Sequence, residues 1–130
     1  MQDPEWKKGK KPSANPVTDL EFVDSPLSKL GEKQCRVASK LAGKLIPNLR
    51  ILLVSPLKRT LQTAYLIFKN HPNFQNIKVI LVPDLRDKLH SPCDIPGPIE
   101  EIIGEFDKLF PNFDYSLINM EDPDRHLWFL

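Results

Sequence analysis

The chain has 130 residues, enough for one domain with a modest core, and its 18 basic and 17 acidic residues leave a net charge of +1. Such a balance argues against a nucleic-acid partner and against attachment to an anionic membrane. The longest apolar runs have only a few residues, so we expect no membrane span and no signal-peptide core in this sequence.

The first part of the chain, residues 1–20, does not have the pattern of a packed element. Four lysines lie there among glycine, proline and small polar residues: Lys7, Lys8, Lys10 and Lys11. Such composition predicts a flexible basic arm, followed by a single domain over residues 21–130. A basic cluster beside Trp6 is one way to contact nucleic acid, but we favour the simpler role of keeping the chain soluble.

A first helix is predicted from Ser28, whose hydroxyl suits the N-cap position, to about Lys44. Pro47 and Asn48 follow and end the helical pattern. Apolar residues recur near one face of this segment: Leu30, Cys35, Ala38, Leu41 and Leu45. The spacing indicates an amphipathic helix that packs inward along that face.

A strand, a turn and a second helix follow in close succession. The four apolar residues from Ile51 to Val54 predict a short buried strand. Ser55 can cap a free backbone N–H, and Pro56 suits the first position of a helix. The helix then has an inward face at the expected spacing: Leu57, Leu61, Ala64 and Phe68.

Arg59 lies in the first turn of this second helix, at the carboxyl end of the preceding strand. Open α/β sheets bind their ligands at that end of their strands. Free N–H groups, the positive end of the helix dipole and a guanidinium converge there, which is the chemistry that phosphate requires. The alternative is that Arg59 is a solvated surface charge.

The rest of the chain adds a second strand over Ile77–Val82, after a polar loop, and a third helix over Pro98–Phe110. The helix carries a buried stripe: Ile99, Ile102, Ile103, Phe106 and Phe110. Strand, helix and strand in this order predict a parallel crossover unit. Residues 111–130 give no clear element.

Several motifs resemble the histidine phosphatase (phosphoglycerate mutase-like) superfamily. The most specific is Ser-Pro-Leu-Lys-Arg-Thr-Leu-Gln-Thr-Ala, from Ser55 to Ala64, which is similar to the superfamily's Ser-Pro-Leu-x-Arg-(Thr/Ala)-x-Gln-Thr-Ala signature. The run from Asp24 to Gln34 resembles the segment before the first helix, where we expect a helix-capping turn. Pro92-Cys93-Asp94 resembles one branch of the superfamily, and the resemblance extends to about Trp128.

The resemblance implies a partial three-layer α/β/α sandwich with a mostly parallel sheet, from which the first, central strand is missing. It implies a phosphate-binding role for Arg59. It also aligns Asp87 with the glutamate that donates a proton to the leaving oxygen, although an aspartate is one methylene shorter and must still come within hydrogen-bond reach. The alternative for Asp87 is an ordinary loop carboxylate paired with Arg86 or Lys88.

The chain departs from the superfamily at both catalytic histidines. The superfamily's nucleophile lies in an Arg-His-Gly motif after the first strand, and a second histidine comes late in the chain; neither is found here. The three histidines that are present do not match those positions. We expect His71 to be solvated in a polar loop, and we assign no catalytic role to His90 or His126.

These features together predict a chain of phosphomonoester phosphatase lineage that is inactive or truncated. The alternative is a pseudoenzyme, a non-catalytic module that binds phosphate or another protein. The expected ligand is a phosphorylated small molecule or a phosphoprotein, and the uncovered edge of the strand over residues 51–54 favours self-association. Cys35 and Cys93 show neither metal-ligand spacing nor a disulfide framework, so we expect reduced thiols, a cytoplasmic location, and no metal or cofactor.

Overall fold

The computed structural model describes residues 23–85, 89 and 92–129. The basic arm expected over residues 1–20 lies outside this part of the chain. The candidate proton donor Asp87 and the histidine His90 also lie outside it.

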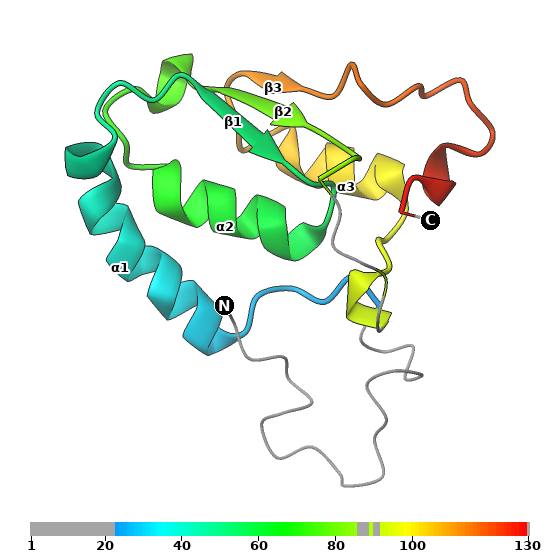
Figure 1. The fold of residues 1–130 in the computed structure, drawn as a ribbon, viewed down its shortest axis with the longest axis horizontal. Coiled ribbons are helices and arrows are strands. Elements are labelled where there is room, and N and C mark those ends of the chain that lie inside the picture. Colours follow the sequence, from blue (N-terminus) through cyan, green and yellow to red (C-terminus); the bar gives the residue numbers. More distant parts are fainter. Residues whose placement is uncertain (1–22, 86–88, 90–91, 130) are drawn as a thin grey trace, which may run out of the picture.

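Helices and strands alternate along the described residues (Figure 1). The α-helices and strands are α1 (Lys29–Leu45), β1 (Ile51–Val54), α2 (Lys58–Phe68), β2 (Lys78–Leu81), α3 (Ile99–Phe106) and β3 (Phe113–Asp114). Short 3-10 turns cover Phe74–Asn76, Pro92–Asp94 and Arg125–Leu127. The strands form a parallel sheet in the order β1-β2-β3. The chain therefore has the expected α/β class and a parallel sheet.

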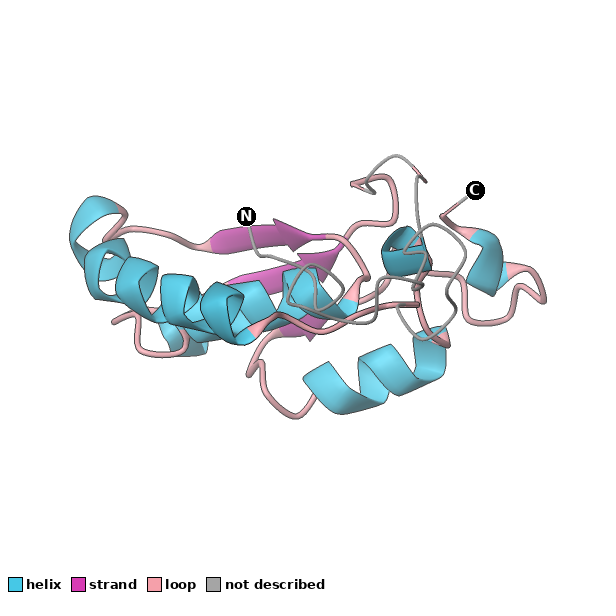
Figure 2. Cartoon of the chain, turned by 90° about the horizontal axis from the view of Figure 1, so that it is seen from below, coloured by secondary structure: helices cyan, strands magenta, loops and turns pink. Residues whose placement is uncertain are grey.

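One face of the sheet is packed and the other is open. Alternate residues point to opposite faces of a strand, and Val54, Val79 and Leu81 are buried in one core with α2 and α3. Figures 1 and 2 show both helices on the same side of the sheet. On the other face, Ile51 is 55% exposed and Leu53 is 58% exposed. The prediction of a buried strand was therefore wrong for half of β1, because the described helices form a layer on one face of the sheet.

Helix α1 begins as predicted, since Ser28 is its N-cap and accepts a hydrogen bond from the Gly31 N–H at 3.0 Å. The helix lies beside α2 (Figure 1), and its buried positions include Cys35 and Ala42. The predicted inward face is only partly buried. Three of its large residues are exposed: Leu30, Leu41 and Leu45.

The third helix and the last strand differ from the sequence-based expectation. Helix α3 ends at Phe106, four residues before the predicted end, although Phe110 is still buried in the core. The sequence predicts no clear element after residue 110, but Phe113–Asp114 pairs in parallel with β2 as β3. A two-residue strand is too short to show a period of two in its sequence.

Candidate functional site

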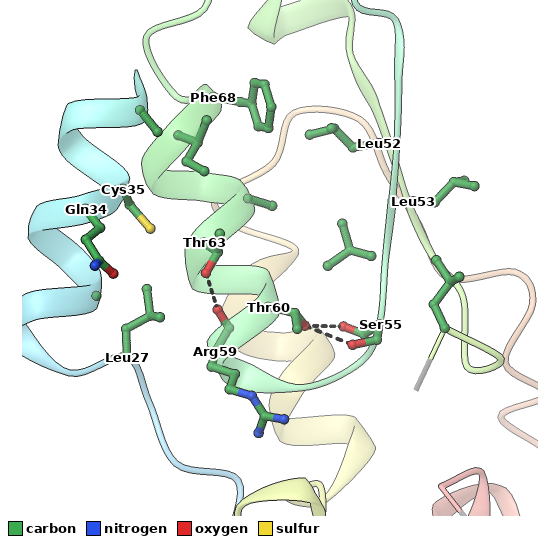
Figure 3. Close-up of a pocket in the computed structure, with 16 residues that line it drawn as sticks. Leu27, Gln34, Cys35, Leu52, Leu53, Ser55, Arg59, Thr60, Thr63 and Phe68 are labelled. Carbon is green, nitrogen blue, oxygen red and sulfur yellow. Dashed lines mark hydrogen bonds between the residues drawn. The ribbon is translucent and has the colours of Figure 1, made fainter. Parts of the chain in front are cut away.

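Arg59 lies at the carboxyl end of β1, in the first turn of α2, and only 8% of the residue is exposed. Figure 3 shows its side chain beside the turn that joins the two elements. This is the position that the sequence predicted. The alternative prediction, a solvated surface charge, was wrong because the loop over residues 92–97 lies close to the start of α2.

The guanidinium of Arg59 is engaged by this loop. Its Nη2 atom lies 3.0 Å from Oδ1 of Asp94, in an ion pair whose side chains are 10% and 12% exposed. Its Nη1 atom donates a hydrogen bond to the carbonyl of Cys93. Removing one member of a buried ion pair typically costs about 3–5 kcal/mol, because the other charge is left without its partner. A carboxylate therefore occupies part of the anion-binding capacity of Arg59.

The N-terminus of α2 is capped by Asp24, not by Ser55 as predicted. The carboxylate of Asp24 accepts the N–H of Lys58 at 2.9 Å through Oδ1 and the N–H of Gly97 at 2.8 Å through Oδ2. The Asp24 N–H in turn donates to the carbonyl of Ile95 at 2.8 Å. A negative charge at this end of the helix also complements the helix dipole. Asp24 thus connects the segment before α1 to the start of α2 and to the loop over residues 92–97.

Ser55 and other residues of the signature build the turn and its attachments. The Ser55 hydroxyl donates to the Thr60 hydroxyl at 3.1 Å, and that hydroxyl lies 2.6 Å from the Ser55 carbonyl and 2.7 Å from the Leu57 carbonyl. Leu57 is the N-cap residue and provides no side-chain hydrogen bond. The Gln62 side chain accepts the Leu27 N–H at 2.7 Å, which fixes the segment before α1 onto α2.

A cavity of about 680 Å³ lies between α1, α2 and β1 (Figure 3). Its lining is largely apolar and includes Leu52, Ile67 and Phe68. Arg59 and Ser55 lie at the opposite end of α2 from Phe68 and supply polar groups there. The arrangement combines an apolar wall with a buried cation at one end, which suits an organic molecule that carries an anionic group.

The two histidines of the described residues are engaged elsewhere. His71 is buried, so the expectation of a solvated side chain was wrong. Its Nε2 lies 2.8 Å from the carbonyl of Ile46, and its Nδ1 accepts the N–H of Asn73 at 3.0 Å. This pattern fixes the proton on Nε2 and gives the ring a structural role beyond the C-terminus of α2. His126 lies 3.6 Å from Glu100.

Two acidic side chains, Asp114 and Glu100, have a lowered pKa, and the groups that lower it are residues other than Arg59. Hydrogen bonds from Ser116, followed in size by one from Lys78, lower the pKa of Asp114 from 3.8 to about 2. A hydrogen bond from Arg125 holds the pKa of Glu100 below its usual value. In the described residues, no three histidine, cysteine or acidic side chains gather as metal ligands, and no helix is long and apolar enough to cross a membrane.

Comparison with known proteins identifies the family. The sequence model of the histidine phosphatase superfamily (branch 1) matches residues 21–124. The chain belongs to the histidine phosphatase superfamily. The match includes the strand, turn and helix that carry Arg59 and the loop that carries Asp94.

Two curated relatives are phosphatases by name. The chain is 29% identical over 101 residues to a probable phosphatase of Schizosaccharomyces pombe, a match that covers 77% of this chain and 44% of the relative. It is 35% identical over 83 residues to the fructose-2,6-bisphosphatase TIGAR of Xenopus laevis, covering 62% of this chain and 28% of the relative. The chain thus spans less than half the length of these relatives. No solved structure matches it significantly.

Sequence reasoning located Arg59, but it missed two carboxylates that shape the site. Asp24 was expected in a capping turn before α1, whereas its side chain caps α2, 34 positions further along the chain. Asp94 was noted only as part of a motif. The signal that could have identified it was an acidic residue in the loop that follows the second strand, since the carboxyl ends of parallel strands lie at the same edge of the sheet.

Proposed function

We propose that this histidine phosphatase chain binds a phosphomonoester through Arg59 and does not hydrolyse it by the superfamily's phosphohistidine route. The observation that supports this most is the buried guanidinium at the carboxyl end of β1, inside the region that matches the family. The ligands we expect are phosphorylated small molecules or phosphoproteins, encountered in the cytoplasm.

The chemistry follows from what the described residues offer. A guanidinium can bind two phosphate oxygens at once, and it stabilises the negative charge that develops when a phosphoryl group is transferred. Covalent transfer also needs a nucleophile fixed beside the phosphorus atom. In the described part of the chain, His71 contacts the carbonyl of Ile46 and His126 lies 3.6 Å from Glu100, so we assign the role of nucleophile to neither.

The direct test is hydrolysis of an aryl phosphate by the purified chain. We expect no turnover above that of Arg59→Ala, because electrostatic stabilisation without a nucleophile gives little rate. Robust turnover that Arg59→Ala abolishes would show an active phosphatase. In that case Asp87→Asn would test the proton donor proposed by resemblance.

Binding is tested separately by thermal unfolding with vanadate. A ligand that binds only the folded state raises the melting temperature, so vanadate should stabilise the wild-type chain and leave Arg59→Ala unchanged. Stabilisation of both proteins alike would place the anion elsewhere and remove the phosphate-binding role from Arg59.

A second candidate function is a pseudoenzyme that binds another protein. Exposed apolar residues on α1 and β1 favour it, in particular Leu41, Leu45 and Leu53. The vanadate experiment separates the two candidates, because a protein-binding module without a phosphate site gains no stability from an oxyanion.

A further inference from the structure

The Arg59–Asp94 pair is more than a structural contact, given where it lies. Asp94 belongs to the 3-10 turn Pro92–Asp94, and its Oδ1 is 3.0 Å from Nη2 of Arg59. A carboxylate in that position uses the same donors, and the same charge, that a phosphate oxygen would use. One partner of the guanidinium in this structure is therefore an internal anion.

We propose that Asp94 is a built-in competitor for the anion site: a phosphate group binds Arg59 only by displacing the Asp94 carboxylate. This inference rests on the proposed function, since it concerns the same arginine. It adds a regulatory contact, and it predicts that the affinity of the site is set by the strength of an ion pair within the chain.

The fold allows this exchange because the loop is anchored independently of Asp94. Asp24 holds its far side through the N–H of Gly97 and the carbonyl of Ile95. Replacement of Asp94 by a phosphate therefore leaves the attachment of residues 95–97 to the start of α2 in place. The guanidinium is paired with an anion both before and after the exchange. The cost of removing this cation from water is therefore compensated with Asp94 and with phosphate alike.

The exchange also favours a particular class of ligand. With Asp94 in place, the two side chains carry no net charge, so a weak anion gains little by approaching. A dianion such as a phosphomonoester gains more from the guanidinium than a singly charged phosphodiester, since the Coulomb attraction scales with the charge. This agrees with the phosphomonoester ligand of the proposed function.

The test measures the affinity for inorganic phosphate by calorimetry in four proteins: the wild type, Asp94→Asn, Asp122→Asn and Arg59→Gln with Asp94→Asn. Asp122 is an exposed carboxylate, so its variant makes the same change of charge away from the site. We expect Asp94→Asn to lower the dissociation constant about tenfold, equivalent to about 1.4 kcal/mol. Asp122→Asn should match the wild type, and the double variant should not bind.

The outcomes separate this inference from the proposed function. Phosphate binding in the wild type that depends on Arg59, together with unchanged or weaker binding by Asp94→Asn, overturns the competitor role and leaves the proposed function intact. No binding by any of the four proteins overturns both. Binding by Asp94→Asn alone supports the competitor role and overturns the proposed binding by the wild-type chain, because it shows a site that the carboxylate keeps closed.

Loss of folding in the variant is covered by a second substitution. If Asp94→Asn does not unfold cooperatively, the same titration is made with Asp94→Ser, which removes the charge and keeps a small polar group. If both variants fail to fold, Asp94 is a structural partner of Arg59 and the proposal is wrong.

Discussion

Two carboxylates lie near the start of α2, and each contacts a different kind of group there. Asp94 faces a side-chain cation, Arg59, and therefore competes with any anion for one guanidinium. Asp24 faces backbone N–H groups, those of Lys58 and Gly97, and so holds the turn in place. The first contact can be exchanged for a ligand, whereas the second is part of the scaffold. Substitution of Asp94 should therefore act mainly on the affinity for an anion, whereas substitution of Asp24 should act mainly on the free energy of unfolding.

Asp24→Ala should lower the free energy of unfolding by about 2–3 kcal/mol, because its carboxylate accepts two backbone N–H groups and hydrogen bonds to charged groups contribute about 1.5–3 kcal/mol. Asp24 also has a φ of 45°, a region that L residues other than Asn and Asp seldom adopt. Asp24→Gly should therefore be less harmful than Asp24→Ala, since glycine adopts this conformation without strain. Urea unfolding measures the free energy of unfolding of both variants, with Asp122→Ala as an exposed control. Equal losses of stability for Asp24→Ala and Asp24→Gly would show that backbone strain at this position does not matter.

For single residues, the sequence predicts positions that depend on local signals but not contacts between distant segments. Arg59 was predicted correctly in position because a strand, a turn and a helix are all local signals. Its ion-pair partner Asp94 is 35 positions away in the sequence. Asp24, which caps α2 at Lys58, is 34 positions away from that residue. Such pairings depend on how loops pack in three dimensions, which no local pattern encodes. For the same reason His71 was read as solvated, although it is buried against the carbonyl of Ile46.

At the scale of elements, α1, β1 and β2 were predicted closely, whereas the start of α2, the end of α3 and the strand β3 were not. Helix α1 was predicted to within one residue of both ends, since a capping serine and a proline mark them. Helix α2 begins at Lys58, later than predicted, because the cap comes from Asp24 and not from the neighbouring Ser55. The strand β3 has only two residues and depends on pairing with β2.

The pairing of β3 with β2 should depend on pH. Asp114 lies on β3, and its Oδ2 is 3.2 Å from Nζ of Lys78 on β2. Its pKa is lowered from 3.8 to about 2, chiefly by hydrogen bonds from Ser116. A depressed pKa stabilises the folded state above the unfolded pKa, so this contribution is fully present at neutral pH. It is lost as the pH falls from about 4 to about 2.

Asp114→Asn should therefore be less stable than the wild type at pH 7, and the difference should shrink as the pH falls below about 4. Melting temperatures across this range measure it, with Asp122→Asn as a control for the loss of one exposed acidic side chain. A difference that stays constant down to pH ~2 would contradict a contribution from the ionised carboxylate.

At the scale of the whole molecule, the described residues leave β1 at an edge of the sheet. The carbonyls of Arg50 and Val54 accept hydrogen bonds from Lys78 and Val82, on the side of β2. In a parallel ladder the backbone groups of alternate residues point the other way, so those of Ile51 and Leu53 face the free edge. Both side chains are also exposed. An apolar strand edge without charged residues is a template for pairing with another strand.

We therefore predict that the chain associates with itself through β1 as its concentration rises. Leu53→Lys places a charge on this edge, which natural sheets use to prevent such pairing, and it should keep the chain monomeric. Leu117→Lys makes the same change at an exposed leucine away from the sheet and should behave like the wild type. Sedimentation over a range of concentrations measures all three. A wild-type chain that stays monomeric, or a Leu117→Lys variant that dissociates as fully as Leu53→Lys, would show that the edge of β1 does not drive association.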